Sequence, residues 1–163
     1  MSGHRVVVAD TTPINYLILI GQIGVLCDLF DEVMLPEAVL AELQHPKAPH
    51  AVADWLLTPP AWLTVERVAQ VDQTIQLGKG ETEAISLAVE RQISIVLMDE
   101  RRGRSAAEAR GLLAVGTLNL IDLADERGLL EGVAVLETLR QTTFRAPSEL
   151  LERFESRMAA RKG

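Results

Sequence analysis

The sequence predicts an α/β protein of three layers, α/β/α, in which helices cover both faces of a central parallel sheet. Short, β-branched apolar runs alternate with helical segments over the first 115 residues, a pattern typical of parallel sheets. After Leu118 the pattern is helical only. The chain has 163 residues, the size of one domain. We therefore expect a single domain over residues 1–163, with an α/β core at about 5–117 and a helical extension at about 118–163.

Short apolar runs predict the strands. Val6–Ala9 is a continuous apolar run, rich in β-branched residues and too brief for a helix, which is typical of a buried strand. The strand after it in the chain contains Val33, and a later one contains the run Ile95-Val96-Leu97. The expected strands cover residues 6–9, 32–35, 62–65, 94–98 and 112–115.

Capping residues and prolines predict the helix boundaries. Pro13 fits the first turn of a helix that Thr11 or Thr12 can cap. Pro36 opens another helix, and the prolines at 46 and 49 then predict a loop over residues 45–50. The expected helices cover residues 14–20, 24–30, 36–44, 51–57, 80–92, 101–110, 118–126, 133–139 and 147–158.

The composition is that of a globular protein with an acidic balance. Hydrophobic residues make up 48% and charged residues 24% of the chain, which excludes a disordered chain. The net charge of −7 argues against a positive surface that grips duplex nucleic acid. The single Cys27 excludes an internal disulfide. No signal peptide is visible, and the apolar stretch at 13–23 is too short to span a bilayer, so we expect a cytoplasmic protein without a membrane partner.

Two expected strands each end in an aspartate. Asp10 follows the first strand, and Asp99 follows the strand at 94–98. The carboxyl ends of parallel strands face the functional crevice of an open sheet, so both side chains belong at one edge. The alternative is that each aspartate only caps the helix after it. Two aspartates at matched positions favour a shared site.

The helix that begins near residue 80 adds a third candidate. On a helical wheel, Glu81 shares its side with Ala84, Ile85 and Ala88 and so points toward the sheet. A carboxylate on such a face is costly unless something pairs with it. Glu83 lies roughly 200° away, on the polar side. Glu81 is therefore the stronger candidate of the two.

Glu42 flanks Val39 on the apolar side of its expected helix, although an exposed acid at the edge of that face is the alternative. If Asp10, Glu42, Glu81 and Asp99 meet in one crevice, they cannot all stay ionised unless a cation binds. Oxygen ligands without histidine or cysteine suit Mg²⁺ or Mn²⁺. Such an ion can activate water for attack on a phosphodiester.

Basic residues follow Asp99 directly. Arg101 and Arg102 lie beside the expected crevice, and their planar guanidinium groups suit phosphate. We take both as candidates for binding the phosphates of a nucleic acid. The alternative is a solvated helix face.

Five sequence blocks, taken together, resemble the PIN-domain family. They are VVVADTTPINYLILIG, VMLPEAVLAEL, LGKGETEAISLA, IVLMDERRGRSAA and VGTLNLI, in that order, and the likeness covers about residues 5–155. More narrowly, the chain is similar to a branch of predicted nucleic-acid-binding proteins of unknown function related to toxin ribonucleases. The resemblance implies a three-layer α/β/α fold and a Mg²⁺- or Mn²⁺-dependent nuclease that cuts single-stranded RNA.

Position by position, the resemblance carries four acids of the family onto this chain. They are Asp10, Glu42, Glu81 and Asp99. Many relatives have aspartate where Glu81 stands, and Glu83 remains the runner-up for that place. Glu100 is a possible auxiliary acid, and Thr11 and Thr117 match positions where the family often has a hydroxyl near the metal.

Other functional classes fit the sequence less well than a nuclease does. Residues 78–80, Gly-Lys-Gly, lack P-loop spacing, and a receiver-like signalling domain leaves Glu42 and Glu81 unexplained. The serious alternative is a catalytically silent module that keeps the fold and binds nucleic acid or protein. The helices at 118–123 and 133–139 can pack on the core or offer a face to a partner. The resemblance to toxins implies a small antitoxin as one partner, and we also expect a homodimer.

Overall fold

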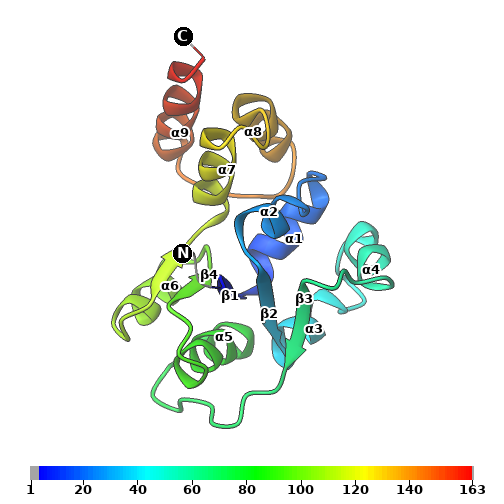
Figure 1. The fold of residues 1–163 in the computed structure, drawn as a ribbon, viewed down its shortest axis with the longest axis vertical. Helices are drawn as coiled ribbons and strands as arrows, with labels where there is room; N and C mark the ends of the chain where they lie inside the picture. Colours follow the sequence, from blue (N-terminus) through cyan, green and yellow to red (C-terminus); the bar gives the residue numbers. More distant parts are fainter. Residues whose placement is uncertain (1–3, 163) are drawn as a thin grey trace.

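The computed structural model describes residues 4–162 and has a five-stranded parallel sheet with the order β3-β2-β1-β4-β5. The sheet lies between helices (Figure 1), which confirms the predicted three-layer α/β/α fold. The strands are β1 (Val6–Ala9), β2 (Glu32–Pro36), β3 (Leu63–Glu66), β4 (Ile95–Leu97) and β5 (Leu113–Val115).

Helices connect the strands and continue after the last one. The helices are α1 (Thr11–Leu19), α2 (Val25–Leu29), α3 (Glu37–Leu43), α4 (His50–Leu56), α5 (Lys79–Glu90), α6 (Arg101–Glu108), α7 (Thr117–Glu126), α8 (Gly132–Arg140) and α9 (Ser148–Ala160). Helix α1 begins three residues before the predicted start, because Asp10 rather than a threonine occupies its N-cap position. No helix within residues 4–162 is long and apolar enough to cross a membrane.

Strand β1 occupies the centre of the sheet. Its Val8 pairs with Met34 of β2 on one side and with Val96 of β4 on the other. Successive side chains of a strand point to opposite faces. Accordingly, Val7 and Ala9 belong to one buried apolar cluster and Val8 to the other. The short, β-branched run of β1 is buried on both faces, as the sequence predicts for a central parallel strand.

The two faces of the sheet are covered by different helices. The cluster around Val7 includes residues of α1, α2 and the C-terminal helices. The cluster around Val8 includes Ile85 of α5 and Ala107 of α6. Because α1 follows β1 and α6 follows β4 in the chain, the N-termini of both helices lie at the carboxyl ends of the strands, where the candidate site lies.

Helices α7, α8 and α9 group together at one end of the molecule (Figure 1). Leu136 and Phe154 of this group share an apolar cluster with Ala9 of β1. Arg161, next to α9, ties it to α7 by ion pairs of 2.8 Å to Asp122 and 2.9 Å to Asp125. The extension thus packs against the α/β layers, and its assignment to the same domain stays a prediction.

Candidate functional site

The ends of two neighbouring strands bring Asp10 and Asp99 to the same edge of the sheet. Asp10 follows β1, Asp99 lies two residues after β4, and the strands pair in parallel. The backbone N–H of Asp10 donates to the carbonyl oxygen of Leu97 at 2.9 Å, which extends the pairing to the first aspartate. Parallel register therefore accounts for the position of both acids.

Asp10 is buried, with 5% of its surface exposed. It occupies the N-cap position of α1, yet its side chain makes no capping hydrogen bond. Burial raises the pKa of Asp10 from 3.8 to about 7, and the negative charges of Glu42, Asp99 and Glu100 add to the shift, while the Thr11 backbone N–H opposes it. Burial and the neighbouring acids thus outweigh the stabilisation that the N-cap position gives to the charge of Asp10.

Asp99 is held by the first residue of α7. The backbone N–H of Thr117 donates to Asp99 Oδ1 at 2.7 Å, and the Thr117 hydroxyl donates to Oδ2 at 2.6 Å. Burial raises the pKa of Asp99, and the two hydrogen bonds and the charge of Arg104 oppose that rise. The N-cap position of the following helix, α6, belongs to Glu100 and not to Asp99. Neither aspartate therefore has the simple capping role that was the alternative.

Glu42 reaches the same region from α3. Its residue is exposed, and its carboxylate accepts a hydrogen bond from the Thr11 hydroxyl at the start of α1. A Cβ on Gly80 would lie 2.9 Å from Glu42 Cδ, so the absence of a side chain at Gly80 leaves the space that the carboxylate occupies. Glu42 is thus both exposed, as the alternative held, and part of the acidic group.

Glu81 lies in the first turn of α5 with an orphaned oxygen. Within residues 4–162 its buried Oε2 atom has no hydrogen-bond partner. Burial raises the pKa of Glu81 from 4.5 to about 7, and the nearby carboxyl groups of Glu100, Asp10 and Glu42 add to the rise. A buried carboxylate oxygen without a donor is costly, so this position is one where a proton or a cation would bind.

The Glu83 side chain contacts the N-terminus of α3. Its Oε1 accepts a hydrogen bond from the backbone N–H of Ala38, at 3.1 Å, in the first turn of α3. That N–H has no partner within its own helix, so Glu83 completes the N-terminus of α3. The structure brings Glu81, and not Glu83, toward Asp10.

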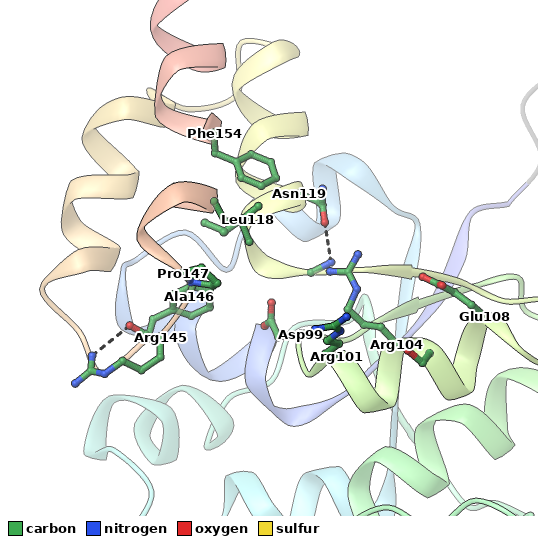
Figure 2. Close-up of a pocket in the computed structure, with 14 residues that line it drawn as sticks. Asp99, Arg101, Arg104, Glu108, Leu118, Asn119, Arg145, Ala146, Pro147 and Phe154 are labelled. Atoms are coloured by element: carbon green, nitrogen blue, oxygen red, sulfur yellow. Dashed lines mark hydrogen bonds between the residues drawn. The ribbon is translucent and has the colours of Figure 1, made fainter. Parts of the chain in front are cut away.

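The basic residues of α6 lie beside this acidic edge. Arg101 and Arg102 are both exposed, and Arg101 lines a cavity of about 530 Å³ that also touches Asp99 (Figure 2). The sequence reasoning missed Arg104, which faces Asp99 and lines the same cavity. Its spacing of three residues from Arg101 puts both on one side of a helix, and this signal could have identified it.

The donor chemistry of the site fits a hard divalent cation. All four acids supply oxygen, as Mg²⁺ and Mn²⁺ prefer, and the orphaned Glu81 oxygen together with the raised pKa of Asp10 marks a place that lacks positive charge. Within residues 4–162, no three carboxylate, imidazole or thiol groups already surround one point closely enough to hold an ion. Binding therefore requires rotation of side chains such as Glu42, which Thr11 now engages.

The fold and the acidic edge define a class of α/β proteins whose sites lie at the carboxyl ends of parallel strands. A family model described as a PIN domain matches residues 6–159, and the chain therefore belongs to the PIN-domain family, as the sequence blocks indicated. PIN domains are generally nucleases with nucleic-acid substrates, and they typically use divalent metals such as Mg²⁺. No curated protein and no solved structure matches the chain.

Proposed function

We propose that this PIN domain is a metal-dependent endoribonuclease that cuts single-stranded RNA. The observation that carries the proposal is the meeting of acids from four elements at one sheet edge, where the pKa of Asp10 and that of Glu81 rise to about 7. Structural carboxylates are normally paired with cations or hydrogen-bond donors. Acids that raise one another's pKa instead are typical of a functional site.

Asp10, Glu42, Glu81 and Asp99 would hold one or two Mg²⁺ or Mn²⁺ ions. When bound, such an ion supplies polarisation of the phosphodiester and activation of the attacking water. Thr117 fixes the orientation of the Asp99 carboxylate through two hydrogen bonds, and Thr11 restrains that of Glu42. Glu100 adds negative charge beside Asp10 and Glu81. In the absence of a cation, Asp10 and Glu81 are partly protonated near neutral pH, and this protonation reduces the repulsion between the acids.

In this proposal, arginines of α6 bind the phosphates of the RNA backbone. Arg101 and Arg102 are exposed, and neither forms an ion pair with another part of residues 4–162. Free guanidinium groups beside the acidic edge are suited to phosphates on either side of the cleaved bond. The overall charge of −7 argues for local contacts of this kind over a broad basic surface.

A toxin role in a toxin–antitoxin pair is the cellular function that we propose. It rests on the likeness to toxin ribonucleases, and it implies a small antitoxin protein as partner, a homodimeric enzyme and action in the cytoplasm. The single cysteine, Cys27, fits a reducing compartment. A catalytically silent module is the second candidate, and one observation favours it: Thr11 and Thr117 already engage Glu42 and Asp99, and the acids described do not yet form a closed ion site.

The test is cleavage of a mixed-sequence single-stranded RNA in Mn²⁺, Mg²⁺ or EDTA by the wild type and by Asp99→Asn. The matched control is Asp54→Asn, which removes an exposed acid of α4. We expect metal-dependent cleavage by the wild type and the control, and a loss of at least 100-fold in Asp99→Asn. Full activity of Asp99→Asn, or cleavage that persists in EDTA, would remove this site from the reaction.

A further inference from the structure

A cavity of about 530 Å³ continues from the acidic edge toward the C-terminal helices. Asp99 forms part of its wall, so the cavity adjoins the candidate catalytic site directly. Figure 2 shows Asp99 between the arginines of α6 and the segment that carries Arg145, with Phe154 across the space. The proposed nuclease reaction gives roles to Asp99 and Arg101 of this cavity but not to the residues on its other sides.

Three guanidinium groups line the cavity. Arg101 and Arg104 come from α6, and Arg145 comes from the loop before α9. Elsewhere in the molecule most arginines are held in ion pairs, as Arg140 is with Glu155 at 2.8 Å. Within residues 4–162 none of the three lining arginines has an ion-pair partner, although Asp99 and Glu108 also line the cavity and the charge of Arg104 acts on Asp99. Unpaired arginines around one concavity indicate an anionic ligand.

Beside its charged and polar residues, the cavity has an apolar wall with two aromatic rings. Phe144 and Phe154 both contribute to the wall, and Phe144 is only partly buried. Tyr16 of α1 holds the Phe144 ring in an edge-to-face contact, with ring centroids 5.2 Å apart and planes at 86°. The Tyr16 hydroxyl is also hydrogen-bonded to the hydroxyl of Thr143 at 2.8 Å. The loop that presents Phe144 and Arg145 is therefore anchored to the helix that follows Asp10.

Asn119 adds a side-chain amide that can donate a hydrogen bond to a ligand. Its side-chain oxygen accepts a hydrogen bond from the backbone N–H of Gly116 at 3.3 Å. That bond orients the amide, and its NH₂ group has no partner within residues 4–162. The cavity thus combines charge, an apolar wall with aromatic rings and an oriented donor.

We propose that this cavity binds one nucleotide of the single-stranded RNA next to the cleaved phosphate. The base lies on the apolar wall formed by Phe144 and its neighbours, the Asn119 amide donates to the base, and the arginines bind the flanking phosphate. Single-stranded nucleic acid is bound by this combination of aromatic contacts and basic groups. The inference rests on the proposed function for the position of the cleaved bond, whereas binding itself is tested without cleavage.

The experiment is fluorescence anisotropy with a labelled, mixed-sequence single-stranded RNA of ten nucleotides, in EDTA so that binding is measured apart from cleavage. The first variant is Phe144→Leu, which keeps an apolar contact with Tyr16 but removes the ring. The second is Arg145→Ala, since within residues 4–162 the Arg145 side chain donates only to the Phe144 carbonyl oxygen. The matched control is Arg127→Ala, an exposed arginine at the far end of α7. A thermal melt of each protein checks that the fold is kept.

We expect the Kd to rise about tenfold in Phe144→Leu, as for the loss of one stacked base, and several-fold in Arg145→Ala, with Arg127→Ala within twofold of the wild type. Equal affinity in all four proteins would overturn the inference, even if the wild type cleaves RNA in Mn²⁺. The expected pattern without any cleavage in Mn²⁺ would support the cavity and contradict the proposed reaction. An absence of RNA binding by the wild type would overturn the inference. An apolar protein segment would then be the alternative ligand of the cavity.

Discussion

The Asp99 carboxylate accepts two hydrogen bonds from Thr117, one from its hydroxyl at 2.6 Å and one from its backbone N–H at 2.7 Å. Thr117 is fully buried and begins α7, so the acid after β4 is bound to the helix after the neighbouring strand β5. This contact orients Asp99 and lowers its pKa against the effect of burial. Thr117 is therefore a positioning residue for the candidate site.

Replacing Thr117 by valine keeps the shape of the side chain and removes the hydroxyl. We expect Thr117→Val to lower the free energy of unfolding by about 1–2 kcal/mol and to reduce cleavage about tenfold. Because the pKa of Asp99 would rise, the acid limb of the pH–rate profile should move to higher pH. Urea denaturation and the pH–rate profile measure these effects, and Thr117→Ser should restore both. An unchanged profile would mean that the hydroxyl supports the fold alone.

The lack of a side chain at Gly80 leaves room for the Glu42 carboxylate. A Cβ at this position would lie 2.9 Å from Glu42 Cδ and 3.1 Å from its Oε1, so Gly80→Ala should push the flexible Glu42 side chain away from Asp10. We expect cleavage to fall at least tenfold while the melting temperature is kept, because alanine favours a helix. Gly24→Ala is the control, since a Cβ there meets nothing within 4 Å. Equal activity of both variants would show that cleavage does not depend on the position of the Glu42 carboxylate.

The two glutamates of α5 should separate in their effects. Glu81→Gln is expected to reduce cleavage at least 100-fold with little loss of stability, because the Oε2 atom of Glu81 has no partner to lose among residues 4–162. Glu83→Ala is expected to lose about 1 kcal/mol of stability, because Ala38 N–H loses its acceptor, and to cleave at nearly the wild-type rate. Initial rates and urea denaturation of both variants check this. The reverse pattern would assign the third acid to Glu83.

Stability should depend on pH through Asp10. Its pKa is about 7 in the folded protein and 3.8 ordinarily, so between these values the folded state binds more protons than the unfolded state. The free energy of unfolding in EDTA should therefore fall as the pH rises from about 4 to 7. Asp10→Asn removes the contribution of Asp10 and leaves that of Glu81, whose pKa is also raised to about 7. The variant should be more stable than the wild type at pH 8.5, by on the order of 4 kcal/mol, with little difference at pH 4. The same difference at both pH values would contradict the raised pKa.

The strands and the acids at their ends could be predicted because both follow from local pattern. The run before Asp10 is apolar and β-branched, and parallel strands present their carboxyl ends at one edge. Helical periodicity likewise separated Glu81 from Glu83, and the Ala38 contact of Glu83 agrees with that separation. The catalytic roles of these residues stay predictions.

The contacts between distant segments could not be predicted in this way. The bond from Thr117 to Asp99 depends on β5 lying beside β4, and strand order is not encoded in hydrophobic periodicity. The same holds for the cavity, whose lining combines residues of α6 with the loop of Phe144, two segments that lie far apart in the sequence. The early start of α1 is a smaller difference, since Asp10 takes the N-cap position while its side chain serves the acidic edge.

The central claim is that Asp10, Glu42, Glu81 and Asp99 form one divalent-metal site. The most direct measurement is the melting temperature during titration with Mn²⁺, for the wild type, Asp10→Asn, Glu81→Gln and the control Glu83→Ala, since an ion that binds the folded state must stabilise it. We expect Mn²⁺ to raise the melting temperature of the wild type and of Glu83→Ala, and to leave Asp10→Asn and Glu81→Gln nearly unchanged. A wild-type melt that stays constant at saturating Mn²⁺, or an equal rise in all four proteins, would contradict the claim.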